Sequence, residues 1–382
     1  MTIARQDDRN GFFSEYRFWS EQKHNILSKY IDAYTRKRGA TNSRIVVVDG
    51  FAGTGYYGND RSQPGSPILL ARHAQRAIDS NAPYRLFCIN VERNRKRYME
   101  LRSALQDYDS SAYSVHHGTL SSVLPLVMQE MGDSPSICFL DPYGVVGMSV
   151  DDLLPLVQRP NTELLVNFST PTVTRLSGSV TSYAREAAGK VQRVNHLLGY
   201  DIHDPSPEWL HQLNKLGRVK WQDWIVDRYI DQIRQRNPSL RYGKSYPVRT
   251  RHRGSIKYHL VFMSRYKPAF TLMSDFVCTE QDQLALKAEE SRAGIGQLSF
   301  LLPQHLTDRE RRYSAVANEL HLFGLKNQDR TRGYYIDEFA FNYFGEFSQR
   351  HFRQMIDQLE QQGRLKFGEG SKRDARPIRF VN

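Results

Sequence analysis

The chain has 382 residues, 40% of them hydrophobic and 12% aromatic, so it can bury a sizeable core and exceeds the usual size of one domain. Its formal net charge of +12 favours a polyanionic partner, although solubility charge is the simpler alternative. No membrane span, signal-peptide core, disulfide framework or Cys/His metal cluster is apparent, so we expect a cytoplasmic protein without a metal site.

The first half of the chain alternates apolar runs with helical patterns. Residues 14–38 carry apolar side chains at helical spacing, which predicts a helical segment within residues 1–40. Strands are predicted at Ile45–Val48, Leu86–Val91, Tyr113–His116, Ile137–Leu140 and Leu164–Asn167, and helices at Ser66–Ala77, Lys96–Leu105 and Leu120–Met131. Apolar strands separated by helices predict an α/β fold, with a mostly parallel sheet and helices on both faces.

The second half departs from this rhythm. Residues 172–239 are helical and polar in pattern and are predicted to be a helical insertion, which leaves 41–171 and 240–290 as the α/β core. Ser245–Arg251 and Lys257–Ser264 predict a hairpin with its turn at Gly254. Residues 305–382 place helices before two short terminal strands, the order of a winged-helix-like domain.

A glycine-rich loop follows the first strand. Gly53 to Gly58 formally match the dinucleotide fingerprint G-x-G-x-x-G, but a polar stretch stands where that fingerprint requires a helix. A tight strand-to-helix turn with Asp49 as a helix cap is another alternative. The loop reads Asp49-Gly50-Phe51-Ala52-Gly53-Thr54-Gly55.

This string resembles the first motif of S-adenosylmethionine (SAM)-dependent methyltransferases, in the F-x-G-x-G form of nucleic-acid enzymes. The resemblance implies a Rossmann-like methyltransferase core. It also implies that Asp49 lies near the amino group of SAM, that Glu92 at the next strand end binds the ribose hydroxyls, and that Gly118 and Thr119 adjoin the adenine. The cofactor-binding residues implied by position are Asp49, Gly50, Phe51, Gly53, Gly55, Glu92, Gly118 and Thr119.

A second motif follows the fourth strand. Asp141-Pro142-Tyr143-Gly144 resembles the D-P-P-Y motif of amino-group methyltransferases with one proline missing. The resemblance implies that Asp141 accepts hydrogens from a target amine and that Tyr143 stacks on a flipped base. An ordinary turn is the alternative for this string.

Several strings together resemble one family, the three-Cys-motif partner proteins of bacteria and phages. That family is similar to methyltransferases and is named for its genomic pairing with a separate three-cysteine protein. The resemblance covers roughly residues 15–270 and implies a methyltransferase-like fold with an unsettled substrate. It is carried by Lys23-His24, Ile26-Leu27, Lys29-Tyr30, Asp49–Gly55, Gly65-Ser66-Pro67, Phe139–Gly144 and Val166-Asn167-Phe168.

Positive charge concentrates around the predicted hairpin. From Asn237 through Ser274 there is no acidic residue, and tyrosines are interleaved with the cations. Cations there would neutralise phosphates and tyrosines would stack on exposed bases, whereas the alternative is a solvated hairpin. The cations are Arg241, Lys244, Arg249, Arg251, Arg253, Lys257, Arg265 and Lys267, of which Arg249, Arg251, Arg253 and Lys257 are the predicted nucleic-acid contacts.

The winged-helix-like region has a weaker charge signal, with 14 basic against 11 acidic residues in 305–382. Protein docking is therefore an alternative to nucleic-acid binding there. Overall we expect a SAM-dependent methyltransferase-like protein that acts on nucleic acid, at an exocyclic amino group of a base, with a partner protein. The alternative is a non-catalytic module on the same fold that binds nucleic acid or recruits a partner.

Overall fold

The computed structural model describes residues 7–57, 63–178, 184–249, 255–293, 304–370 and 373–381. The chain divides into two compact units, Met1–Arg265 and Tyr266–Asn382. Residues 266–290, grouped with the α/β core from the sequence, thus fall in the second unit. In the described part of the chain, no helix has both the length and the apolar character needed to cross a membrane.

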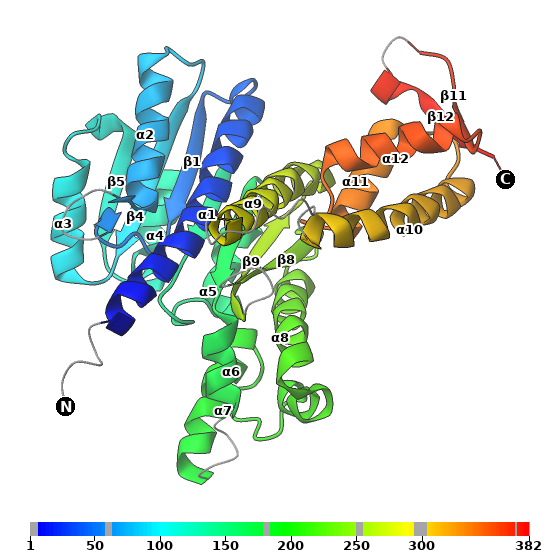
Figure 1. Ribbon diagram of the computed structural model, residues 1–382. Coiled ribbons are helices and arrows are strands. Elements are labelled where there is room, and N and C mark those ends of the chain that lie inside the picture. Colours follow the sequence, from blue (N-terminus) through cyan, green and yellow to red (C-terminus); the bar gives the residue numbers. More distant parts are fainter. Residues whose placement is uncertain are drawn as a thin grey trace. The chain divides into compact units, whose positions relative to one another are not determined.

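The first unit is built on a seven-stranded sheet with the order β5-β4-β1-β6-β7-β9-β8 (Figure 1). The five strands from β5 to β7 are parallel, and β9 runs antiparallel between β7 and β8. Numbered by their appearance in the chain, the strands of this sheet have the order 3-2-1-4-5-7-6. The dinucleotide-binding order is 3-2-1-4-5-6, so the two differ at the last strands. The strands are β1 (Arg44–Asp49), β4 (Arg85–Glu92), β5 (Tyr113–His117), β6 (Ser136–Leu140), β7 (Thr162–Phe168), β8 (Tyr242–Arg249) and β9 (Ile256–Ser264).

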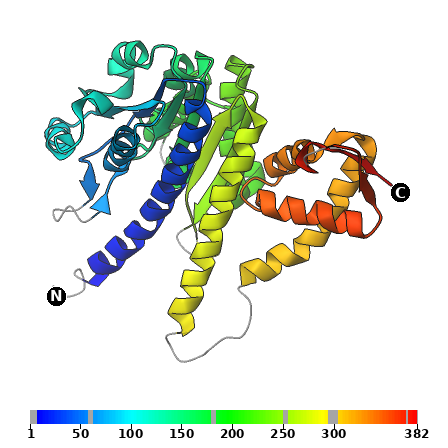
Figure 2. The ribbon, with the colours of Figure 1, turned by 90° about the horizontal axis from the view of Figure 1, so that it is seen from above.

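Helices cover both faces of this sheet, as predicted. Alternate side chains of β1 point to opposite faces, so Val46 and Val48 join the core under α4 and α5 while Ile45 and Val47 face the other way. On that second face α1 runs beside the sheet (Figure 2), and α2 packs on β1 and β4. These helices are α1 (Asp7–Gly39), α2 (Ser66–Asp79), α3 (Arg95–Leu105), α4 (Leu120–Met131) and α5 (Val150–Gln158).

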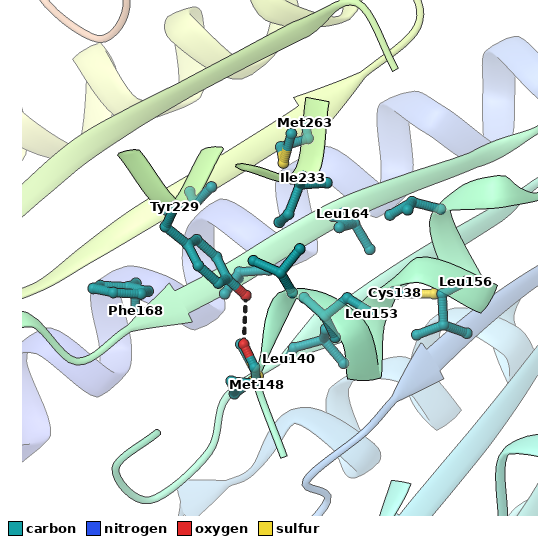
Figure 3. Packing of buried hydrophobic residues seen from close by; sticks show 14 of the residues in the cluster. Cys138, Leu140, Met148, Leu153, Leu156, Leu164, Phe168, Tyr229, Ile233 and Met263 are labelled. Atoms are coloured by element: carbon teal, nitrogen blue, oxygen red, sulfur yellow. Dashed lines mark hydrogen bonds between the residues drawn. The ribbon is translucent and has the colours of Figure 1, made fainter. Parts of the chain in front are cut away.

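Three helices follow β7 and extend beyond the sheet (Figure 1): α6 (Thr170–Gly178), α7 (Ala184–Leu198) and α8 (Glu208–Arg236). The core holds α8 in place through Tyr229, whose ring lies 4.8 Å from that of Phe168 and whose hydroxyl donates to Met148 O at 2.8 Å (Figure 3). Trp209 and Trp221 are buried and pack in the same core. Cys88, Cys138 and Cys278 are buried as free thiols.

The second unit has a core of its own around Leu320, Tyr335, Phe352 and Ile378. Its strands form a three-stranded sheet in the order β10-β12-β11. The order from α10 onward is the one that a winged helix requires, and that assignment stays a prediction. The elements are α9 (Lys267–Ala293), α10 (Gln304–Lys326), β10 (Arg330–Thr331), α11 (Arg332–Asn342), α12 (Gln349–Gln361), β11 (Leu365–Phe367) and β12 (Pro377–Phe380).

Candidate functional site

Polar side chains collect where the parallel strands of the first unit end. After β1 the chain adds β4 and β5 on one side of β1 in the strand order, and then adds β6 and β7 on its other side. The topological switch point therefore lies between β1 and β6. Ligands of open α/β sheets bind at the carboxyl ends of the strands at such a point. Asp49 ends β1, Glu92 ends β4, Asn167 lies near the end of β7 and Asp141 follows β6.

The glycine loop contains two residues in the left-handed region, Gly53 with φ +68° and Gly55 with φ +89°. A Cβ at Gly53 would meet no atom within 4 Å, so the backbone there faces open space. A Cβ at Gly55 would instead lie 3.1 Å from Ala104 Cβ, and one at Gly50 would lie 2.6 Å from Leu140 Cδ2. Gly53 therefore offers an approach surface to a ligand, whereas the other two glycines serve close packing.

The chain leaves this loop through a small hairpin and not through a helix. Gly55 leads into β2 (Tyr56–Tyr57), which pairs with β3 (Gln63–Pro64), and α2 begins only at Ser66. The dinucleotide fingerprint places a helix at this point, so the hairpin argues against that alternative. Gly58 itself lies outside the described residues.

Asp49 is completely buried at the end of β1. The N–H of Phe51 donates to its Oδ1 at 3.2 Å, and Oδ2 has no hydrogen-bond partner among the described residues. Burial raises the pKa of Asp49 to about 7, against the opposing effects of the Ser66 side chain and the Phe51 backbone N–H. The N-cap of α2 is Gly65, so Asp49 is not the cap of that helix.

Glu92 ties the glycine loop to the end of β4. Its Oε2 accepts the N–H of Gly53 at 3.0 Å, and its Oε1 accepts the N–H of Asn94 at 2.7 Å. A carboxylate has about four lone-pair positions, so two remain for further donors. The predicted contact with ribose hydroxyls is compatible with this geometry, and the link to Gly53 is an addition that the sequence did not indicate.

Gly118 and Thr119 have structural roles at the start of α4. The N–H of Gly118 donates to Glu92 O at 3.1 Å, and a Cβ at Gly118 would lie 2.7 Å from Ser122 Oγ. Thr119 is the N-cap of α4 and accepts the N–H of Ser122 at 3.2 Å. Their predicted contact with adenine stays a prediction.

Asp141 is already engaged on both oxygens. Lys23 of α1 forms an ion pair with Oδ2, and the Asn167 side-chain amide donates to Oδ1. Burial works to raise the pKa of Asp141, but the Lys23 charge and the two hydrogen bonds outweigh it and hold this pKa below its ordinary value. Pro142 is buried, whereas the Tyr143 side chain is 98% exposed and therefore makes almost no packing contact within the chain.

Lys23, His24 and Asn167 had no role predicted from the sequence. Burial, followed by the Lys23 charge, lowers the pKa of His24 to about 3, so this imidazole is neutral at physiological pH. Its ring centroid lies 5.7 Å from that of Tyr57. A signal was available, because Lys23 and His24 lie within one helical turn of the apolar residues Ile26 and Leu27, and charged residues are rarely buried without a partner.

The predicted basic hairpin is present as β8 and β9, with β8 at the edge of the sheet. Arg249 is exposed at the end of β8 and Lys257 is partly buried near the start of β9, whereas Arg251, Arg253 and the turn at Gly254 lie outside the described residues. Arg265 binds the carbonyl oxygens of Thr162 and Val157, and Lys267 forms an ion pair with Glu338. These last two cations are thus occupied by internal contacts.

Comparisons with known proteins found no match by sequence and only distant matches by structure. No family and no curated protein matches the sequence. Similar solved structures include the O-methyltransferase TomG from Streptomyces achromogenes, which is involved in tomaymycin synthesis and was solved with SAM: 16% identity, TM-score 0.30, 62% of this chain and 78% of that one. PKMT2 from Rickettsia typhi has 10% identity, a TM-score of 0.27, and coverage of 62% and 53%. StiE O-MT residues 942–1257 have 11% identity, a TM-score of 0.21, and coverage of 60% and 71%. At these TM-scores the likeness carries no argument, and the fold assignment rests on the strand order.

Proposed function

We propose that this protein is a SAM-dependent methyltransferase-like enzyme that acts on nucleic acid. The observation that carries the proposal is the glycine loop that follows Asp49 at the switch point, where Gly53 faces open space and its N–H binds the strand-end carboxylate of Glu92. The departure of the sheet from the dinucleotide-binding order and the hairpin after Gly55 support SAM over a dinucleotide.

The residues present fit this cofactor. The unpartnered Oδ2 of Asp49 suits a cationic amino group, because a buried acceptor without a partner is costly. Glu92 keeps acceptor capacity for two hydroxyl donors. Gly118 and Thr119 would border the adenine. Bound SAM would supply an electrophilic methyl group, and the chain would contribute mainly the orientation of the acceptor.

Asp141 would contribute a hydrogen-bond acceptor at the carboxyl end of β6. Since its pKa lies below the ordinary value, it is a weak base and suits hydrogen-bond acceptance better than proton removal. The exposed ring of Tyr143, on the loop that follows, supports stacking on a base. The net charge of +12 and the β8–β9 hairpin, with Arg249 and Lys257, support a nucleic-acid substrate.

Calorimetry with SAM and with S-adenosylhomocysteine tests the cofactor. We expect dissociation constants in the micromolar range and their loss in Asp49→Ala and Glu92→Ala. Glu100→Ala, on an exposed part of α3, is the matched control and should bind as the wild type does. An absence of binding heat with both ligands at several temperatures would sink the proposal.

A second function is a non-catalytic module that binds nucleic acid or recruits a partner, such as a protein with the three-cysteine motif. Two observations favour this second function. Lys23 and Asn167 already occupy Asp141, the residue that would accept from the target amine. Some cations of the second unit are paired with acidic side chains. Arg353 lies 3.0 Å from Asp374, and Arg373 lies 2.6 Å from Glu360.

Transfer of labelled methyl groups to DNA, RNA and a three-cysteine partner distinguishes the two functions. An enzyme labels one of them, and Asp141→Ala removes most of that label while cofactor binding persists. Binding of nucleic acid or partner without transfer to any of the three would favour the module.

A further inference from the structure

The Lys23–Asp141 ion pair is almost buried, with side chains 8% and 17% exposed. Buried pairs gain little stability, because the cost of desolvating both charges offsets their attraction, and apolar replacements of similar volume are often as stable or more stable. Stability therefore does not explain why α1 brings a lysine to the carboxyl end of β6. The position of the pair, beside the switch point and Asp49, points to a ligand.

This pair has more hydrogen-bonding capacity than the chain uses. An ammonium carries three N–H donors, and among the described residues Lys23 donates one of them, to Asp141. The carboxylate of Asp141 accepts two bonds of about four that it can take. The Oδ1 of Asn167 is buried and has no partner in the described part of the chain. Donor and acceptor capacity thus remain side by side.

Three aromatic side chains lie near the pair, namely His24, Tyr57 and Tyr258. His24 and Tyr57 lie with their ring centroids 5.7 Å apart, and Tyr258 of β9 is buried close enough to Lys23 and Asp141 to interact with both electrostatically. His24 is neutral, so the only full charges in this group are those of the pair itself. Flat rings next to one donor and one acceptor suit a planar heteroaromatic ligand better than an aliphatic amine.

We propose that Lys23 is the specificity-determining residue for the acceptor of the methyl group. Its ammonium donates to a ring nitrogen of a nucleobase, while Asp141 accepts from the adjacent exocyclic amino group. The ligand class is therefore a base with an amidine edge, namely cytosine or adenine. The inference rests on the proposed function for its assignment of Asp141, and it adds a residue from a different element, α1.

Nucleoside binding tests this directly, with cytidine and 3-deazacytidine as the matched ligands. The deaza compound keeps the amino group but lacks the ring nitrogen that Lys23 would contact. In the presence of saturating S-adenosylhomocysteine, we expect the wild type to bind cytidine roughly tenfold more tightly than 3-deazacytidine, as for one hydrogen bond to a charged group. Lys23→Met should abolish this preference, and Lys37→Met, at an exposed position of the same helix, should retain it.

A second variant serves as the control for a loss of folding. Lys23→Met leaves the Asp141 charge unpaired and should lower the melting temperature, whereas Lys23→Met/Asp141→Leu removes both charges and should regain most of it. We expect the double variant to fold and to show no preference for cytidine. A double variant that retains the preference, or a wild type that binds both nucleosides equally or not at all, would overturn the inference.

The titrations are repeated without S-adenosylhomocysteine. If S-adenosylhomocysteine does not bind, the proposed function is wrong. The role of Lys23 depends only on the preference for cytidine over 3-deazacytidine, so each of the two proposals can fail separately.

Discussion

Burial raises the proton affinity of the Asp49 carboxyl group. Its pKa is about 7 in the folded chain, against roughly 3.9 for an unperturbed aspartate. Between these values the folded state holds a proton that the unfolded state has lost, so stability falls as the pH rises through this window. In a protein that binds SAM, the amino group of the ligand would replace that proton.

Asp49→Asn tests this linkage. The variant cannot titrate, so its free energy of unfolding should fall less than that of the wild type between pH 5 and pH 8. Urea unfolding at these two pH values measures the difference. Parallel pH dependences of the two proteins would contradict the raised pKa of Asp49.

At the scale of single elements, Gly53 of the glycine loop can be substituted to block the approach of a ligand without disturbing the packing of the fold. Gly53→Ala places a methyl group where no atom lies within 4 Å, so its cost to stability is backbone strain alone, about 1–2 kcal/mol at φ +68°. We expect this variant to fold and to lose at least tenfold in SAM affinity, because the methyl group covers the approach surface.

Gly132→Ala is the matched control for this loop. Gly132, the C-cap of α4, also has a positive φ and open space around a Cβ, but it lies on the connection to the start of β6, away from the strand carboxyl ends. It should also lose stability through backbone strain but bind SAM normally, as calorimetry and thermal unfolding can measure. Equal loss of binding in both variants would show that strain, and not the approach surface, matters.

Local sequence patterns predicted most helices and strands of the first unit but not the tertiary contacts between them. The strands of the parallel sheet and the helix Leu120–Met131 follow from apolar periodicity. The helix Val150–Gln158 was missed, although Ser149 and Asp152 form a capping box that signals its start. Lys23 and Asp141 are 118 residues apart, so no local pattern can place them together. The same holds for Glu92 and Gly53.

At the scale of the whole molecule, the charge is less available than the composition suggests. Arg265 and Lys267 have internal partners, and in the second unit Arg353 and Arg373 face acidic side chains. Arg249, exposed at the end of β8, and Lys257 stay the predicted contacts with phosphates.

The double variant Arg249→Ser/Lys257→Ser should weaken binding to single-stranded DNA and RNA and lower the slope of log K against log salt by roughly 1–2, since each phosphate contact contributes about 0.7 to 0.9. Fluorescence anisotropy at several salt concentrations measures the slope. Arg95→Ser, on the exposed start of α3, should leave it unchanged. An unaltered slope in the double variant would move the interface away from the hairpin.

The placement of α1 also has a consequence for synthesis on the ribosome. The ribosome makes this segment before the residues that it contacts, because Lys23 pairs with Asp141, and Tyr30 bonds Glu163, 133 residues later. At 5 to 20 residues per second, the interval before Glu163 is made is roughly 7 to 27 seconds. Throughout it, the apolar face of Ile26, Leu27 and Ile31 has no sheet to cover it, so we expect nascent α1 to need shielding from aggregation until β6 and β7 are made.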